Sequence, residues 1–290
     1  MKKLFAMVLV FAMIFALAAC GGNTGSSAPA AESPSAEAEQ EPAPAEETAE
    51  EAAEPVEAAE PEAAEAAKEE MPKEAAGEAA VMSYAEYAAA ELDSAVSVET
   101  YVQDKQSWWD NKATVYTQDE NGAYFAYNMS CTKEDYEKLV PGQKIRISGF
   151  KSEWSGEVEI IDGTFELLDG SFVAEPVDVT ALLGTDDLLA HQNQLVSFKG
   201  LTIVAKDDGK SPFYYGWDNS GEAGTDADLY FDASLNENVY TFVVEYYLRN
   251  ETTDAYQAVQ NLKVGDTVDL EGFLYWYEGP QPHITAVAVK

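Results

Sequence analysis

A strand-like segment near the middle of the chain occurs twice, because residues 139–150 match residues 262–273. Each copy has a turn glycine, a stretch of alternating apolar and polar residues, and a second glycine followed by phenylalanine. Alternation with a period of two predicts a half-buried β-strand, and a glycine inside a strand marks a bulge or a sharp bend. Such a strand suits a small closed barrel, so the repeat predicts two barrels. The glycines that set the shared register, 123 positions apart, are Gly142 with Gly265 and Gly149 with Gly272.

The part of the chain that is expected to fold is acidic in its own right. The formal net charge is −36 at pH 7, and residues 81–290 hold 36 Asp or Glu against 13 Lys or Arg. An acidic surface repels phosphate backbones and gains nothing from counterion release, so we expect no nucleic-acid partner. The length of residues 81–290 is enough for one large or two small domains. The aromatic content of 11% suits β-rich structure.

Residues 1–20 have the pattern of a secretory signal. Two lysines precede an apolar run that is too short to span a membrane, and the run ends in Leu17-Ala18-Ala19-Cys20. This ending resembles the lipobox of bacterial lipoproteins. The resemblance implies cleavage before Cys20, diacylglycerol on its sulfur, and a protein anchored in the cell membrane and facing the extracellular side. An ordinary signal peptide with a chance cysteine is the alternative.

Residues 21–80 are predicted to be a disordered tether. They consist almost wholly of Ala, Glu, Pro, Ser and Gly and show no apolar periodicity. Such a segment cannot bury a core. We expect it to act as a spacer between the membrane and the folded domains.

Residues 81–175 are predicted to form the first barrel, in the order β-β-β-α-β-β. Ser83 and Glu86 make a capping box for a helix that reaches about Ser94. Thr132 is the expected N-cap of the second helix, over residues 133–139. The expected strands cover residues 96–102, 113–118 and 123–127, the repeated stretch 139–150, and residues 157–161, with a hairpin turn at 119–122.

Residues 176–290 are predicted to form the second barrel. Strand one is expected at 195–204, strand two at 213–217 and strand three at 229–231. Residues 239–248 are interpreted as an insertion. A helix capped by Thr252 or Thr253 should then run to Leu262 and lead into the repeated strand.

The two copies resemble the OB-fold. The resemblance is carried by the β-β-β-α-β-β order, an Asp-x-x-Gly hairpin, and a Gly-x-x-Ile/Val-x-Ile/Leu-x-Gly strand. Together with the lipobox and the tether, the chain is similar to uncharacterised lipoproteins of Gram-positive bacteria with tandem OB-fold-like domains. The predicted fold class is therefore all-β with short helices. The resemblance implies no catalytic residues.

No motif in the sequence indicates catalysis or a cofactor. His191 and His283 are the only histidines, and neither accompanies a nucleophile motif, a phosphate-binding loop or a zinc-binding spacing. Cys131 stands apart from any basic cluster and is interpreted as a small buried hydrophobe. We therefore expect neither an enzyme nor a bound cofactor.

Aromatic residues are the candidates for ligand binding. OB-folds bind on the face of strands two and three, between the loops that join strands one to two and four to five. In the first barrel these places hold Trp108, Trp109, Tyr124 and Trp154. The hypothesis is a platform for an uncharged or cationic ligand, a glycan or a peptide. For the strand residue Tyr124, packing in the core is the stronger interpretation.

An acidic segment at residues 218–228 is a weak candidate for calcium, through Asp218, Asp226 and Asp228. Its spacing does not fit an EF-hand, and a solvated turn is the stronger interpretation.

The sequence as a whole predicts a membrane-anchored, extracellular binding protein with a glycan or peptide ligand. The alternative is a structural envelope protein whose barrels pack on each other or on a partner.

Overall fold

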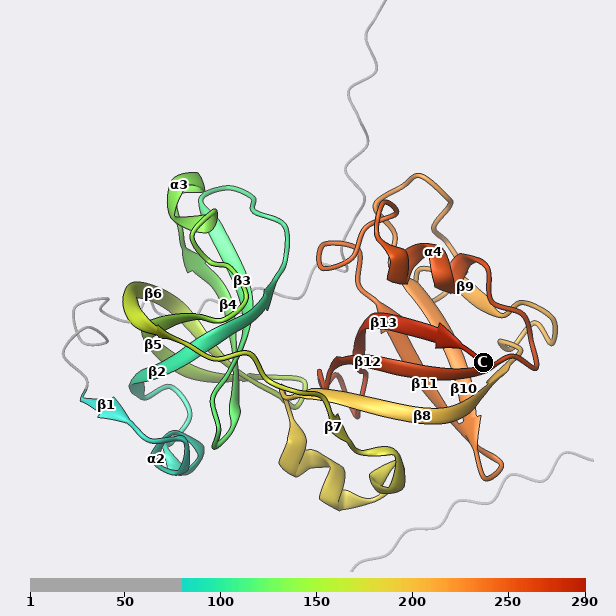
Figure 1. Ribbon diagram of the computed structural model, residues 1–290, viewed down its shortest axis with the longest axis horizontal. Coiled ribbons are helices and arrows are strands. Elements are labelled where there is room, and N and C mark those ends of the chain that lie inside the picture. Colours follow the sequence, from blue (N-terminus) through green and yellow to red (C-terminus); the bar gives the residue numbers. More distant parts are fainter. Residues whose placement is uncertain (1–79) are drawn as a thin grey trace, which may run out of the picture. The chain divides into compact units, whose positions relative to one another are not determined.

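The computed structural model describes residues 80–290, whose strands form two separate sheets (Figure 1). The predicted signal peptide with Cys20 and almost all of the predicted tether lie outside the described residues. Among residues 80–290, no helix is both long and apolar enough to cross a membrane. The described chain is mostly β-structure with short helices, as predicted.

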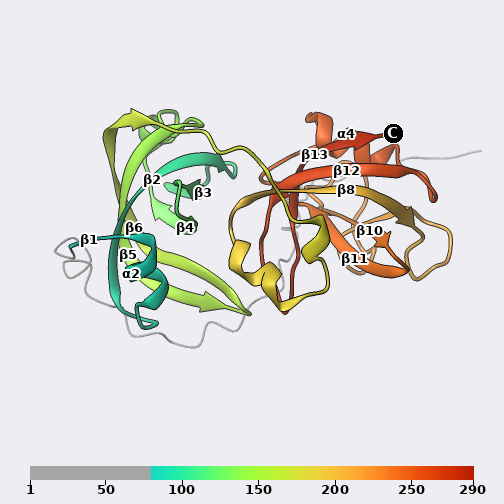
Figure 2. The same cartoon turned by 60° about the horizontal axis from the view of Figure 1, so that its bottom comes forward.

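Five strands close into the first barrel. Hydrogen bonds join them in the order β2-β3-β4-β6-β5, and β5 pairs back with β2. The β4–β6 pair is parallel, and the other four pairs are antiparallel. Figure 2 shows β5 and β6 as long, curved neighbours. The strands are β2 (Ala95–Lys105), β3 (Lys112–Gln118), β4 (Ala123–Ser130), β5 (Gln143–Trp154) and β6 (Glu157–Ser171).

The second barrel has the same strand order. Its order is β8-β12-β13-β11-β10, with β10 pairing back to β8. In both barrels a short helix lies between strands three and four: α3 (Lys133–Tyr136) and α4 (Asp254–Gln260). This arrangement is the OB-fold. The strands are β8 (Leu195–Val204), β10 (Leu229–Leu235), β11 (Asn238–Val244), β12 (Thr267–Phe273) and β13 (His283–Val289).

The predicted assignment of strands two and three in the second barrel is wrong. Residues 213–217 supply only β9 (Phe213–Tyr215), an extra strand at the edge of β10. The segment 239–248, interpreted as an insertion, holds all but the first residue of β11, which is strand three. The β10–β11 turn consists of Asn236 and Glu237, both with positive φ, of 49° and 71°. Because this turn has no glycine, the usual sequence signal of a two-residue hairpin is missing.

The helices begin where their capping residues predict. Ser83 caps α2 (Tyr84–Ala89) in a complete capping box, while Thr132 and Thr253 cap α3 and α4. The first helix ends before Ser94. The Lys151 ammonium donates to the carbonyls of three residues at its end and so satisfies groups that a further turn would have paired. The remaining short elements are β1 (Val81–Met82), β7 (Val177–Asp178), η1 (Thr180–Leu182) and η2 (Asp186–His191).

The repeated glycines have the roles that the sequence predicts. Gly142 and Gly265, at the turns, both have positive φ, of 88° and 96°. Gly149 and Gly272 lie at register shifts in β5 and β12. A Cβ on Gly272 would lie 2.1 Å from the carbonyl oxygen of His283, so the backbones approach too closely there for any other residue.

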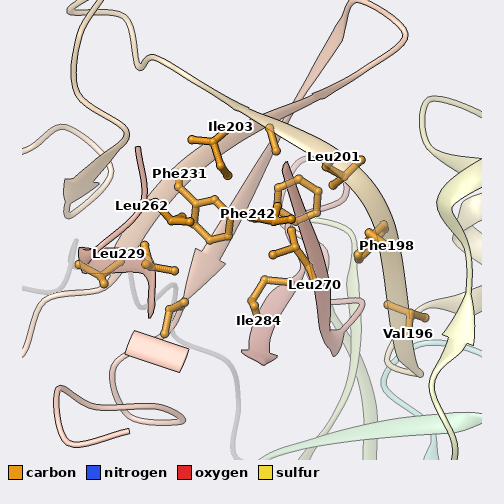
Figure 3. Close-up of a cluster of buried hydrophobic side chains, with 14 of the residues drawn as sticks. Val196, Phe198, Leu201, Ile203, Leu229, Phe231, Phe242, Leu262, Leu270 and Ile284 are labelled. Carbon is orange, nitrogen blue, oxygen red and sulfur yellow. The ribbon is translucent and has the colours of Figure 1, made fainter. Parts of the chain in front are cut away.

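Each barrel has its own apolar core. The alternating residues of the first strand, Val96, Val98, Thr100 and Val102, are all buried, as predicted. In the second barrel the inward side chains of all five strands meet around Phe231 and Phe242 (Figure 3). The stacking of these two rings, with centroids 5.7 Å apart, fills the barrel interior.

Candidate functional site

The ligand face of an OB-fold is the outer side of strands two and three, which are β3 and β4 in the first barrel. Two large aromatic residues point outward there, Tyr116 and Phe125. Both are nevertheless buried, and Tyr116 has an exposed fraction of 0%. Residues of the second barrel cover them. We call this contact surface between the barrels the joint.

The centre of the joint is an aromatic cluster. The Tyr116 ring stacks on that of Phe273, with centroids 4.3 Å apart and planes at 8°. The Phe125 ring meets Tyr275 edge-on at 5.5 Å. Leu248 completes the buried cluster, and Leu195 packs against it. Aromatic pairs in these geometries contribute about 0.5–1.5 kcal/mol each beyond the area they bury.

A buried histidine links the two barrels at the same place. The Tyr116 hydroxyl lies 2.8 Å from Nδ1 of His283, and Tyr275 stacks on the imidazole at 4.3 Å. Burial lowers the pKa of His283 to about 3, so the ring is neutral at physiological pH. In the tautomer that carries its proton on Nε2, the Nδ1 atom accepts the hydroxyl proton of Tyr116. The contact is a structural hydrogen bond inside an apolar cluster.

One edge of the joint is formed by the β2–β3 loop of the first barrel. The Ser107 amide donates to the Tyr247 carbonyl at 2.7 Å, and Gln106 Nε2 donates to Glu245 Oε2 at 3.2 Å. Burial, with Asp228 nearby, raises the pKa of Glu245 to about 8. Close by, an ion pair joins the two barrels, formed by Oδ2 of Asp104 and Nη2 of Arg249.

The opposite edge is formed by the β5–β6 turn. Glu157, the first residue of β6, accepts from the Trp276 amide at 2.9 Å and from Gln192 Nε2 at 3.2 Å. Burial raises the pKa of Glu157 to about 8. The turn itself touches the equivalent turn of the second barrel, because the Glu278 amide donates to the Ser155 carbonyl at 2.8 Å.

The second barrel therefore takes the place of a ligand on the first. It contacts the outer side of strands two and three and both flanking loops, which are the three parts of an OB-fold that hold a ligand. This face is occupied from within the same chain.

The structure separates the four candidate aromatics of the first barrel. Trp108 is half-buried, donates to the Cys131 carbonyl at 2.9 Å and lies under the Lys133 ammonium. Trp109, beside it on the β2–β3 loop, is exposed. Tyr124 lies in the core, edge-on to two tyrosines of the N-terminal segment. Trp154 is exposed at the opposite edge of the joint, on the β5–β6 turn. These side chains do not form one platform.

The sequence alone did not predict that two exposed aromatic residues, one from each barrel, lie beside touching turns. Trp154 and Tyr277 occupy equivalent positions in the two barrels, 123 residues apart, and each has an exposed fraction of 43%. Each directly precedes a partner in the Ser155–Glu278 hydrogen bond, so the two aromatics flank touching turns. The shared offset is visible in the sequence, but the contact between the turns is not.

The three calcium candidates are not brought together. The Asp218 carboxylate accepts from the Ser220 amide, and that of Asp228 from the Tyr246 amide at 2.7 Å. Across residues 80–290, no group of three or more His, Cys, Asp or Glu side chains is arranged to hold a metal ion.

No protein-family model and no curated protein matches the chain. Several solved structures are similar at low identity. One, described as "Structural mimicry for functional antagonism", is 16% identical over 68% of this chain and 94% of its own, with a TM-score of 0.32. The Ifi202 HINa domain in complex with 20-bp double-stranded DNA is 16% identical over 68% and 98%, with a TM-score of 0.31.

A replication protein A heterotrimer bound to single-stranded DNA is also similar. It is 12% identical over 68% of this chain and 49% of its own, with a TM-score of 0.29. Likenesses this distant carry no conclusion about what the present chain binds. Its own topology defines a tandem OB-fold architecture.

Proposed function

We propose that this chain is a lipid-anchored protein of the extracellular membrane face that binds a glycan or a peptide of neutral or positive charge. The anchor is Cys20, and the binding surface is the pair of touching turns with Trp154 and Tyr277. The observation that carries the binding surface is this aromatic pair, which stays exposed at the edge of the joint. No catalytic activity, cofactor or nucleic-acid partner is part of the proposal.

The charge of the surface supports this choice of ligand. Glu153 and Glu278 are exposed directly beside the aromatic pair. Aromatic faces stack on sugar rings and attract cations, and the acidic neighbours repel phosphate and other anions. A neutral sugar or a basic peptide satisfies both features.

A glycan and peptide array tests the binding surface. The double variant Trp154→Ala/Tyr277→Ala should lose the ligands that the unmodified chain retains, with unchanged circular dichroism. Trp217→Ala is the matched control, because Trp217 is 72% exposed on the segment between β9 and β10. Trp109→Ala examines the other exposed candidate separately. An unaltered array profile in the folded double variant refutes the proposed surface.

The anchor is tested independently of the ligand. Metabolic labelling with a fatty acid should mark the unmodified chain and leave Cys20→Ser unlabelled and released into the medium. Labelling that persists in Cys20→Ser would contradict lipidation at Cys20. It would not bear on the proposed binding surface, which the array tests separately.

A structural role in the envelope is the second candidate. One observation favours it: the second barrel fills the ligand face of the first and joins the two barrels in one unit. A structural role predicts that neither the unmodified chain nor the aromatic variants bind any ligand on the array. It also predicts that deletion of the chain alters envelope integrity.

A further inference from the structure

Two buried carboxyl groups lie at opposite edges of the joint and have only neutral partners. Glu157 has an exposed fraction of 0% and accepts from the Trp276 amide and the Gln192 side chain. Glu245, also buried, accepts from Gln106 and from the amides of two residues that follow it. A buried carboxylate without a cationic partner is costly, and protonation removes the cost.

The hydrogen bonds around Glu157 indicate where its proton lies. Its Oε1 atom and Oδ1 of Asn193 are both buried without a hydrogen-bond partner. The two side chains are close enough to interact. Asn193 Nδ2 donates to the Val158 carbonyl at 3.1 Å, which fixes the orientation of the amide and leaves Oδ1 as an acceptor. A proton on Glu157 Oε1 pairs these two oxygens, whereas an ionised Glu157 leaves two acceptors with no donor.

Burial and a neighbouring carboxylate favour protonation of each glutamate, while the hydrogen bonds that each one accepts oppose it less strongly. The neighbouring carboxylate of Glu159 acts on Glu157, and that of Asp228 acts on Glu245. The cation nearest in sequence to Glu245, Arg249, is already paired with Asp104. Four tyrosine hydroxyls also interact electrostatically with one or both glutamates. They belong to Tyr87, Tyr116, Tyr230 and Tyr275.

We propose that the joint is a proton-operated latch. Glu157 and Glu245 are protonated while the second barrel covers the ligand face of the first, and loss of their protons releases that face. Opening exposes the outward aromatics Tyr116 and Phe125, the part of the OB-fold that ordinarily meets a ligand. Opening also breaks the Ser155–Glu278 contact, so it separates the two turns that carry the proposed binding surface.

The direction of the pH dependence follows from the raised pKa values of the two glutamates. Burial in the closed joint raises the pKa of both glutamates from 4.5 to about 8, so closing takes up protons between these values. Closure therefore weakens as pH rises from 4.5 to 8, by up to about tenfold per pH unit for each glutamate.

His283 acts in the opposite direction. Burial lowers its pKa from 6.5 to about 3, so closing releases a proton in that range and acidification opposes closure. The two glutamates and the histidine together predict the tightest joint near pH 4.5. From pH 4.5 to 6.5 the histidine offsets one glutamate, so the equilibrium constant for closing falls by up to about tenfold per pH unit. From pH 6.5 to 8 only the two glutamates titrate, and the constant falls by up to about a hundredfold per pH unit.

The test is a pH titration of the full chain labelled with fluorotryptophan, followed by ¹⁹F NMR. Trp276 reports on the joint, because its ring packs against Gly156 of the opposite turn. Trp217, exposed and remote in sequence from the joint, is the internal reference. We expect the Trp276 resonance to change between pH 6.5 and 9 while the Trp217 resonance and the circular dichroism stay constant.

Glu157→Gln/Glu245→Gln should remove this transition. Glutamine keeps the acceptor oxygen and cannot ionise, and at position 157 its amide donates to Asn193 Oδ1 as the protonated acid does. Glu153→Gln, an exposed position at the end of β5, is the matched control and should titrate like the unmodified chain. The proposal is overturned if Trp276 is unchanged from pH 5 to 9.5 in the unmodified chain, or if the double glutamine variant keeps the transition.

Discussion

Replacing Tyr116 by alanine should uncouple the two barrels. The side chain belongs to the first barrel, yet its ring stacks on Phe273 and its hydroxyl bonds His283 in the second. Truncating a fully buried aromatic residue costs about 3–5 kcal/mol, and a buried imidazole nitrogen left without its hydrogen-bond partner costs about 1–3 kcal/mol more. A domain is stable by only about 5–15 kcal/mol, so this loss removes a large part of what holds the barrels together.

Urea unfolding followed by ¹⁹F NMR of fluorotryptophan measures the effect. Three tryptophans lie in the first barrel and two in the second, so each barrel reports its own transition. In the unmodified chain the two transitions should coincide. In Tyr116→Ala they should separate, with both midpoints lowered.

Tyr124→Ala is the matched control for this experiment. Tyr124 is an equally buried tyrosine of the same barrel, but it packs within the first barrel against Tyr84 and Tyr87. It should lower stability by a similar amount without separating the transitions. If Tyr116→Ala leaves the second-barrel resonances unfolding at their original midpoint, the joint does not couple the barrels and the reasoning is refuted.

Two further predictions concern single positions. Gly272→Ala should cost at least about 2 kcal/mol in chemical denaturation, because its Cβ meets the His283 carbonyl oxygen. Gly200→Ala, whose Cβ meets nothing within 4 Å, is strained only by its positive φ of 68° and should cost less, and equal losses would contradict the close approach. Burial raises the pKa of Cys131 to about 11, so alkylation by iodoacetamide at pH 8 in a Cys20→Ser chain should be about a hundredfold slower than for a free thiol. A rate equal to that of a model thiol would argue against burial.

Local patterns predicted the first barrel and, in the second, its first strand, its helix and the repeated strand. The repeated glycines, the capping residues Ser83 and Thr132, and the alternation from Val96 to Val102 act over a few residues, so the sequence alone reveals them. The assignment failed at the β10–β11 turn, where positive φ values at Asn and Glu replace the glycine that normally signals a hairpin.

The joint lay beyond what local patterns reveal. Alternation shows that Tyr116 and Phe125 point out of the barrel, but not that Phe273 and Tyr275, about 150 residues later, cover them. The same holds for Glu157 and Glu245, because acidic residues are so frequent that no pair of them is distinctive in sequence. Only the tertiary contacts show that these two carboxyl groups are buried without a cation.

Hydrogen exchange at the amides that bridge the barrels tests the joint most directly. The amides of Ser107, Trp276 and Glu278 donate to acceptors in the opposite barrel and lie outside the barrel strands. At pH 5.5, where the closed joint is favoured, we predict that these three amides exchange as slowly as those of the neighbouring strands. Exchange at the rate of unstructured peptides, with both barrels folded, would contradict the conclusion that the second barrel occupies the ligand face of the first.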